Sequence, residues 1–199
     1  MKISLAQTIS FILNPLVVIV FVPFFFVYKS THNFTSAVHW TLYTLIFLFG
    51  IALFVIFEVK KGTFTDLDVS HREQRPLLFL VGIIISSIYF VSLFFLDAPP
   101  VLFAIAFGIM LGIAVVSIIN KRVKASIHVA AVTALILAVA VGFGGYYLFL
   151  LFLIPLVVWA RLTTKRHSLT EAITGGILGG LLSLSVYYGY LAVKIFFHK

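Results

Sequence analysis

Arg161, His167 and Glu171 lie within one short polar segment between two long apolar stretches, at spacings that could support chemistry. His167 and Glu171 are four residues apart, so on a helix they would share a face and lie within reach of each other. A carboxylate that accepts a hydrogen bond from one imidazole nitrogen orients the ring and raises the basicity of the other nitrogen. A nearby guanidinium, such as that of Arg161, can bind a phosphate through two parallel hydrogen bonds. The segment therefore predicts an activated histidine next to an anion-binding arginine.

The same residues also have a purely structural interpretation. Lys165 and Arg166 make the segment basic, and basic loops commonly flank membrane-spanning helices. In that interpretation His167 is incidental, and Glu171 is an acid that favours the start of a helix. The choice between the two interpretations depends on the rest of the chain.

The chain as a whole has the composition of a polytopic membrane protein. Its 199 residues are 62% hydrophobic and 10% charged, with a mean hydropathy of +1.20, which is far more apolar than a soluble domain requires. We therefore expect a single integral membrane domain over residues 1–199. Cysteine is absent, which excludes disulfides, thiolate metal ligands and thiol nucleophiles. The net charge of +8 comes from basic residues at the ends of apolar stretches, so we expect the lipid bilayer, and no nucleic acid, as the partner.

Apolar stretches of about 20 residues predict an all-α fold, a polytopic transmembrane helix bundle of about six to seven spans. Asn14-Pro15 predicts a break in the first span, and Pro155 predicts a kink in the sixth. Pro76 suits the first turn of the third span, because the N–H that proline lacks would be unpaired there anyway. The predicted spans cover residues 6–27, 38–57, 77–96, 101–119, 126–142, 146–160 and 168–197.

Three polar segments between these spans, 68–76, 124–128 and 161–171, are called here the first, second and third motif segments. The first ends in Arg-Pro, the second contains Ser-x-His, and the third reads Arg-x5-His-x3-Glu. In this order they resemble the three motifs of the type 2 phosphatidic acid phosphatase superfamily. That family's first motif ends in Arg-Pro, its second is ordinarily Pro-Ser-Gly-His, and its third has Arg, His and an acid at these spacings. The resemblance implies a membrane enzyme that hydrolyses lipid phosphates or isoprenoid diphosphates and needs no metal or other cofactor.

The resemblance also implies a role for each matching residue. His167 would attack phosphorus and form a phosphohistidine, while Glu171, where the family usually has Asp, would orient and stabilise its ring. His128 would protonate the leaving group and then activate water for the second step. Arg75 and Arg161 would bind the phosphoryl oxygens and stabilise charge in the transition state.

The chain departs from the family's pattern in the first and second motif segments. The family's first motif begins with Lys, and the corresponding residue here is Asp68, which cannot bind phosphate. Arg72 lies one helical turn before the motif's arginine and is the expected substitute. In the second segment Ser126 is retained as a phosphate donor, and the preceding Lys124 is expected to add a further phosphate contact. The second segment has two further changes: Ala125 occupies the position of the family's Pro, and Ile127 occupies that of its Gly.

Counting spans predicts that the three motif segments share one side of the membrane. Two predicted helices separate the first segment from the second, and two more separate the second from the third, so each pair returns to the same side. Eleven of the 14 lysines and arginines lie on that side, which favours a cytoplasmic location in the cell membrane. The resemblance favours the extracytoplasmic side, where most of the family acts.

Glycines continue the helical row that begins with His167 and Glu171. Gly175 and Gly179 follow at intervals of four residues, and Gly176 and Gly180 form a parallel row. Rows of small residues allow helix backbones to approach closely in lipid. We expect this packing to hold in place the helix that carries the histidine–glutamate pair.

Other functions remain open at this stage. Asp66 and Asp68, with Glu73, could hold Mg²⁺ against a diphosphate, as in membrane prenyltransferases, although the chain has no second aspartate cluster. A phosphohistidine could also pass its phosphoryl group to another alcohol, which would make the protein a lipid phosphotransferase. A non-enzymatic lipid transporter or scaffold could keep the same fold, but nearly uncharged spans argue against ion coupling.

Overall fold

The computed structural model describes residues 2–197, with side chains through Tyr188, and within this range it contains helices and no strand. Among the described residues, six helical segments are long and apolar enough to cross a membrane, and a further apolar helix, Ile127–Phe143, is shorter. The predicted all-α, polytopic membrane fold is therefore confirmed, and the chain is an integral membrane protein. The helices are α1 (Lys2–Ile12), α2 (Pro15–Val20), α3 (Val22–Thr31), α4 (Phe34–Lys61), η1 (Arg72–Gln74), α5 (Arg75–Phe95), α6 (Pro100–Asn120), α7 (Ile127–Phe143), η2 (Gly145–Phe152), α8 (Leu153–Thr163) and α9 (Leu169–Phe197).

Local sequence signals set most helix boundaries. The first span is interrupted at Asn14, whose side-chain oxygen accepts a hydrogen bond from the backbone N–H of Leu16 at 2.9 Å, and α2 begins at the next residue, Pro15. Pro76 lies in the first turn of α5, as predicted. Ser126 caps α7, because its hydroxyl accepts from the backbone N–H of Val129 at 3.5 Å.

The kink predicted at Pro155 stays a prediction, but the helix changes type close to this residue. Residues Gly145–Phe152 form a 3₁₀ helix, and the change to α-helix comes at Leu153, so Pro155 lies in the first turn of α8. Because η2 runs directly into α8, Pro155 lies two residues past the point at which the backbone changes from 3₁₀ to α-helix.

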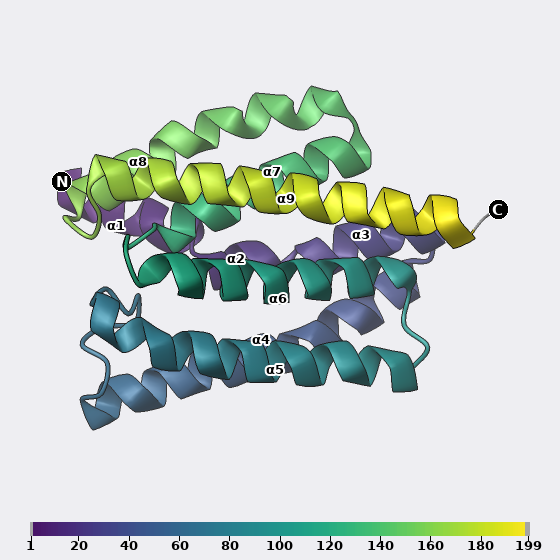
Figure 1. The fold of residues 1–199 in the computed structure, drawn as a ribbon, viewed down its shortest axis with the longest axis horizontal. Coiled ribbons are helices and arrows are strands. Elements are labelled where there is room, and N and C mark those ends of the chain that lie inside the picture. Colours follow the sequence, from purple (N-terminus) through teal and green to yellow (C-terminus); the bar gives the residue numbers. More distant parts are fainter. Residues whose placement is uncertain (1, 198–199) are drawn as a thin grey trace. The chain divides into compact units, whose positions relative to one another are not determined.

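The chain forms two compact units, each described by itself: Met1–Val18 with Val123–Lys199, and Ile19–Arg122. In the first unit, α1 packs on α8, and α7 packs on α8, α9 and η2; Figure 1 shows α9 running beside α7. The second and third motif segments belong to this unit, and the first motif segment belongs to the other. The expectation of a single domain over residues 1–199 stays a prediction. One buried apolar cluster of the first unit consists of Val129, Val132, Ile136, Val157 and Ala172.

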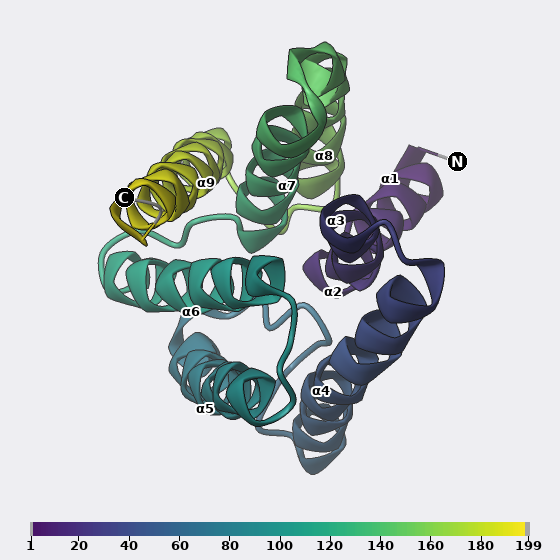
Figure 2. The same cartoon turned by 90° about the vertical axis from the view of Figure 1, so that its right-hand side faces the viewer.

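The second unit consists of two helix pairs, α3 with α4 and α5 with α6, which also pack on each other (Figure 2). One end holds an aromatic and aliphatic cluster around Trp40, Tyr89 and Leu93. At the other end Phe64 and Val69 of the polar connection are buried against Val55 of α4. Val69 belongs to the first motif segment, so this buried contact fixes the beginning of that segment.

The glycine row on α9 packs against α7 as expected. A Cβ added to Gly175 would overlap the backbone carbonyl of Ser126, and one added to Gly179 would overlap that of Ala130. At Gly176 the nearest atom to an added Cβ is a Val129 methyl at 3.7 Å, which is an ordinary contact. Only the first row therefore sets the distance between the two helix backbones.

Candidate functional site

The third motif segment begins with a helix end that Arg161 itself helps to build. Its backbone carbonyl accepts from the N–H of Arg166 at 3.1 Å, and the N–H of Lys165 donates to the carbonyl of Leu162 at 3.0 Å. Lys165 has φ 55°, in the left-handed region. These bonds form a Schellman motif, which ends α8 and turns the chain sharply.

A capping box follows at once and starts α9. The hydroxyl of Ser168 accepts from the backbone N–H of Glu171 at 3.3 Å, and the carboxylate of Glu171 accepts from the backbone N–H of Ser168 at 3.3 Å. The spacing alone predicted that His167 and Glu171 share a helix face. This prediction is wrong, because His167 precedes the helix. The reason is that Ser168 leaves the helical conformation to act as the cap.

His167 and Glu171 nevertheless meet, through a hydrogen bond of 2.8 Å between Nδ1 and Oε2. Because a carboxylate can only accept, the proton lies on Nδ1, and Nε2 of the neutral ring carries a lone pair. The side chain of His167 is 1% exposed and that of Glu171 is 24% exposed. A carboxylate that orients a buried imidazole in this way leaves Nε2 as a candidate nucleophile.

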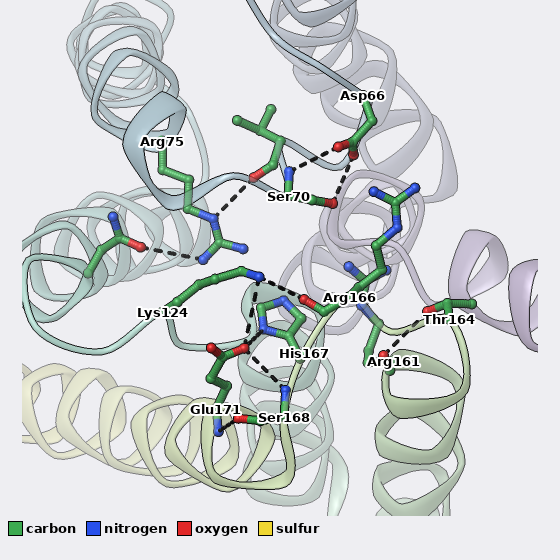
Figure 3. A network of polar contacts seen from close by, with 12 residues as sticks. Asp66, Ser70, Arg75, Lys124, Arg161, Thr164, Arg166, His167, Ser168 and Glu171 are labelled. Atoms are coloured by element: carbon green, nitrogen blue, oxygen red, sulfur yellow. Dashed lines mark hydrogen bonds and ion pairs between the residues drawn. The ribbon is translucent and has the colours of Figure 1, made fainter.

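Lys124 joins the second motif segment to the third. Its ammonium donates to the backbone carbonyl of Arg166 at 2.8 Å and lies 4.0 Å from Oε2 of Glu171. Figure 3 shows Lys124 reaching between the Arg166 carbonyl and Glu171, beside the imidazole of His167. The backbone N–H of Ser126 also donates to the backbone carbonyl of Glu171 at 3.0 Å. The structure thus brings these two motif segments together at one end of their unit.

His128 lies in the first turn of α7 and is buried, with 5% of its surface exposed. Its Nε2 is 3.4 Å from Nδ2 of Asn14, at the break between α1 and α2. Ser126, two residues earlier, is fully buried as the helix cap. The sequence analysis placed both residues of the second motif segment at the start of a helix, and the structure agrees.

Arg161 is buried on α8, with 2% of its surface exposed. Its Nη1 donates to the hydroxyl of Ser10 on α1 at 2.6 Å. A guanidinium in this position keeps a fixed orientation, because a neutral hydroxyl and the surrounding packing hold it in place.

Arg75 of the first motif segment is buried at the start of α5 in the other unit. Its Nε donates to the backbone carbonyl of Val69 at 3.2 Å, and Nη1 to the side-chain oxygen of Asn120 at 3.5 Å, as Figure 3 shows for Arg75. Arg72 lies in η1, one turn earlier, and donates to the backbone carbonyl of Arg122 at 3.3 Å. The helical turn expected between these two arginines is present, while their part in phosphate binding stays a prediction.

Asp66, one of the two aspartates considered for Mg²⁺, shapes the loop in which it lies. The carboxylate of Asp66 accepts from the backbone N–H of Asp68 at 3.0 Å and from the N–H and hydroxyl of Ser70 at 3.3 and 3.0 Å. Such bonds shape an Asx turn. Among the described residues, no three His, Cys, Asp or Glu side chains gather as a possible metal site.

The sequence analysis missed Ser10 and Asn120 near the motif segments, and it assigned Asn14 only to the break in the first span. Each is a polar side chain within or at the end of an apolar span, and such side chains in a membrane helix usually have a specific partner. That rule could have singled them out, although it could not have named their partners, which are 45 to 151 residues away in the chain.

Comparison of the chain with family models, with curated proteins and with solved structures finds no match.

Proposed function

We propose that this chain is a metal-independent membrane phosphatase that hydrolyses a lipid phosphate or isoprenoid diphosphate through a phosphohistidine. The observation that carries the proposal is the buried His167–Glu171 pair, at 2.8 Å, with Lys124 bridging to it from the second motif segment. A carboxylate-oriented imidazole beside fixed cations suits attack on a phosphoryl group better than it suits a structural loop.

In the first step of this proposal, the lone pair on Nε2 of His167 attacks phosphorus. A P–N bond forms, the bond from phosphorus to the leaving oxygen breaks, and that oxygen takes the electron pair. Glu171 stabilises the positive charge that the imidazole gains. Arg161 and Lys124 are cations placed in the same unit to offset the charge of the phosphoryl oxygens.

In the second step, water attacks the phosphohistidine. The P–N bond breaks, its electron pair returns to Nε2 of His167, and inorganic phosphate leaves. His128 is the group proposed for proton transfer, and the Ser126 hydroxyl is proposed as a further donor to phosphate. Arg75 and Arg72 belong to the other unit, so their assignment to the same phosphate rests on the resemblance alone.

The decisive experiment is a phosphate-release screen over lipid monophosphates and diphosphates in detergent, with and without EDTA. We expect turnover that EDTA does not reduce, and its loss by several orders of magnitude in His167→Ala, because a covalent nucleophile has no substitute. His71→Ala, which removes an exposed histidine, is the matched control. Near-normal turnover in His167→Ala would refute the proposal.

Two alternatives have distinct outcomes in the same screen. A phosphotransferase would form a new phosphate ester when a primary alcohol is added, at the expense of free phosphate. A transporter or scaffold would give no turnover with any substrate. For the location, we propose the cell membrane, with the motif segments on the cytoplasmic side.

A further inference from the structure

Asn14 is the residue whose contact with His128 the proposed reaction does not yet explain. It lies at the break between α1 and α2, within an otherwise apolar stretch. Its partner is 114 residues away in the chain, and both residues belong to the same compact unit. A polar side chain in a membrane helix that reaches such a partner has a specific role in placing it.

The hydrogen bonds of Asn14 fix which way its amide points. The side-chain oxygen accepts from the backbone N–H of Leu16 at 2.9 Å. Only the oxygen can accept from an N–H, so Nδ2 faces Nε2 of His128, at 3.4 Å. An amide NH₂ can only donate, and therefore Nε2 of His128 is the acceptor and carries no proton.

The charges around the start of α7 act in the same direction. Lys124 precedes α7, Arg161 is a cation on α8, which packs on α7, and Glu171 is the one carboxylate in the described part of the helices that pack on α7. That carboxylate already accepts from His167 and Ser168. Protonating Nε2 of His128 would place a new N–H against the amide hydrogens of Asn14 and add a cation to a basic region.

We propose that Asn14 is a positioning residue that keeps Nε2 of His128 unprotonated, so that His128 acts as the base in the second step and not as the acid in the first. This inference rests on the proposed function. It departs from the resemblance, which gives His128 both tasks. The 3.4 Å contact is long for a hydrogen bond, so the attacking water can replace the amide at Nε2 and give its proton to the ring.

The consequence is a preference between substrates. A lipid monophosphate releases an alkoxide, which needs a proton from an acid as its bond to phosphorus breaks. A lipid diphosphate that is attacked at its terminal phosphorus releases a phosphate monoester, which leaves as a stable anion without that proton. Asn14 therefore makes the site selective for diphosphates, with inorganic phosphate and the lipid monophosphate as products.

The test compares dodecyl phosphate with dodecyl diphosphate, two lipids that share one tail, in detergent. We expect the wild-type protein to favour the diphosphate by at least about 100-fold in kcat/KM, the low end of what a general acid contributes. Asn14→Asp is the informative variant, because it keeps the oxygen that accepts from Leu16 and replaces the donor facing His128 with an acceptor. It should raise monophosphate turnover by about 10-fold or more and lower diphosphate turnover, because a protonated Nε2 cannot take the proton of the attacking water.

A spectroscopic measurement reads the ring directly. In ¹⁵N NMR of histidine-labelled protein, with the signal assigned through His128→Gln, Nε2 of His128 should be unprotonated in wild type and protonated in Asn14→Asp. Asn14→Ala, which removes the amide, should lose the strong preference for one tautomer. Thr8→Val is the matched control on α1, since Thr8 is exposed and its hydroxyl donates to the Ser4 carbonyl of the same helix, and it should match wild type in both measurements.

The outcomes separate the two proposals. Comparable wild-type rates on both lipids, or a protonated Nε2 of His128 in wild type, would overturn the inference and leave the phosphatase assignment standing. Failure to hydrolyse either lipid, together with no turnover in the wider screen, would overturn the proposed function and the substrate preference with it.

Discussion

Glu171 performs two tasks with one carboxylate. It accepts from Nδ1 of His167 at 2.8 Å and from the backbone N–H of Ser168 at 3.3 Å. The first contact orients a candidate nucleophile, and the second stabilises the start of α9. A substitution that separates these tasks can show whether the carboxylate's charge matters for chemistry.

Glu171→Gln makes that separation, because glutamine can also complete a capping box. We expect the helix start and the melting temperature to change little, while kcat falls by roughly 10²–10⁴-fold, since a neutral amide stabilises the imidazolium poorly and can select the wrong tautomer. The measurements are steady-state phosphate release and thermal unfolding in detergent. A lowered melting temperature with a kcat that falls only as far as the folded fraction falls would show that the residue is a cap alone.

At the scale of elements, the α7–α9 contact places the second motif segment against the third. The backbone N–H of Ser126 bonds to the carbonyl of Glu171, and Gly175 lies one turn further along, against the carbonyl of Ser126. The glycine is needed because any side chain there would meet backbone atoms that cannot move aside. Helix packing therefore sets the geometry of the candidate site.

Gly175→Ala and Gly179→Ala should each destabilise the protein by about 1–3 kcal/mol, as overpacking usually does, and should reduce turnover by separating the helices. Gly176→Ala is the matched control, since its added methyl would meet only a Val129 methyl at 3.7 Å. Thermal unfolding and phosphate release check both effects. A harmless Gly175→Ala together with a damaging Gly176→Ala would contradict the observed packing.

At the scale of the whole molecule, charge is distributed unevenly within each unit. In the first unit the motif end carries Lys124, Arg161, Lys165 and Arg166, whereas the segment 144–152 at the other end of α7 has no charged residue. In the second unit the end that holds Arg72 and Arg75 is likewise the more basic. Short loops rich in lysine and arginine mark the cytoplasmic side.

This distribution predicts the sidedness that we propose, and single cysteines can test it because the chain has none. Lys165→Cys reports on the motif end, and Tyr146→Cys on the other end of α7; both side chains are exposed. With 17 residues, α7 separates these ends by roughly 25 Å. In intact cells, a membrane-impermeant maleimide should label the Tyr146 variant and spare the Lys165 variant. The reverse pattern would contradict the charge argument and place the motif end on the extracytoplasmic side.

The sequence by itself determined the spans, the break at Asn14-Pro15 and the pairing of His167 with Glu171. These features depend on local physics: apolar length, the missing N–H of proline, and side chains four residues apart. Even here the cap at Ser168 displaced His167 from the helix face, because cap geometry competes with helical periodicity. The row of Gly175 and Gly179 indicated close packing without naming the helix that packs there.

Only the tertiary structure decided which distant polar groups meet. Asn14 bonds to His128, and Ser10 to Arg161, across 114 and 151 residues of chain. In an apolar surrounding, a buried polar side chain must find a partner, but which partner it finds depends on how whole helices dock. Docking is set by the sum of many small packing contacts, such as the contact between Gly175 of α9 and the start of α7. No short sequence pattern records that sum.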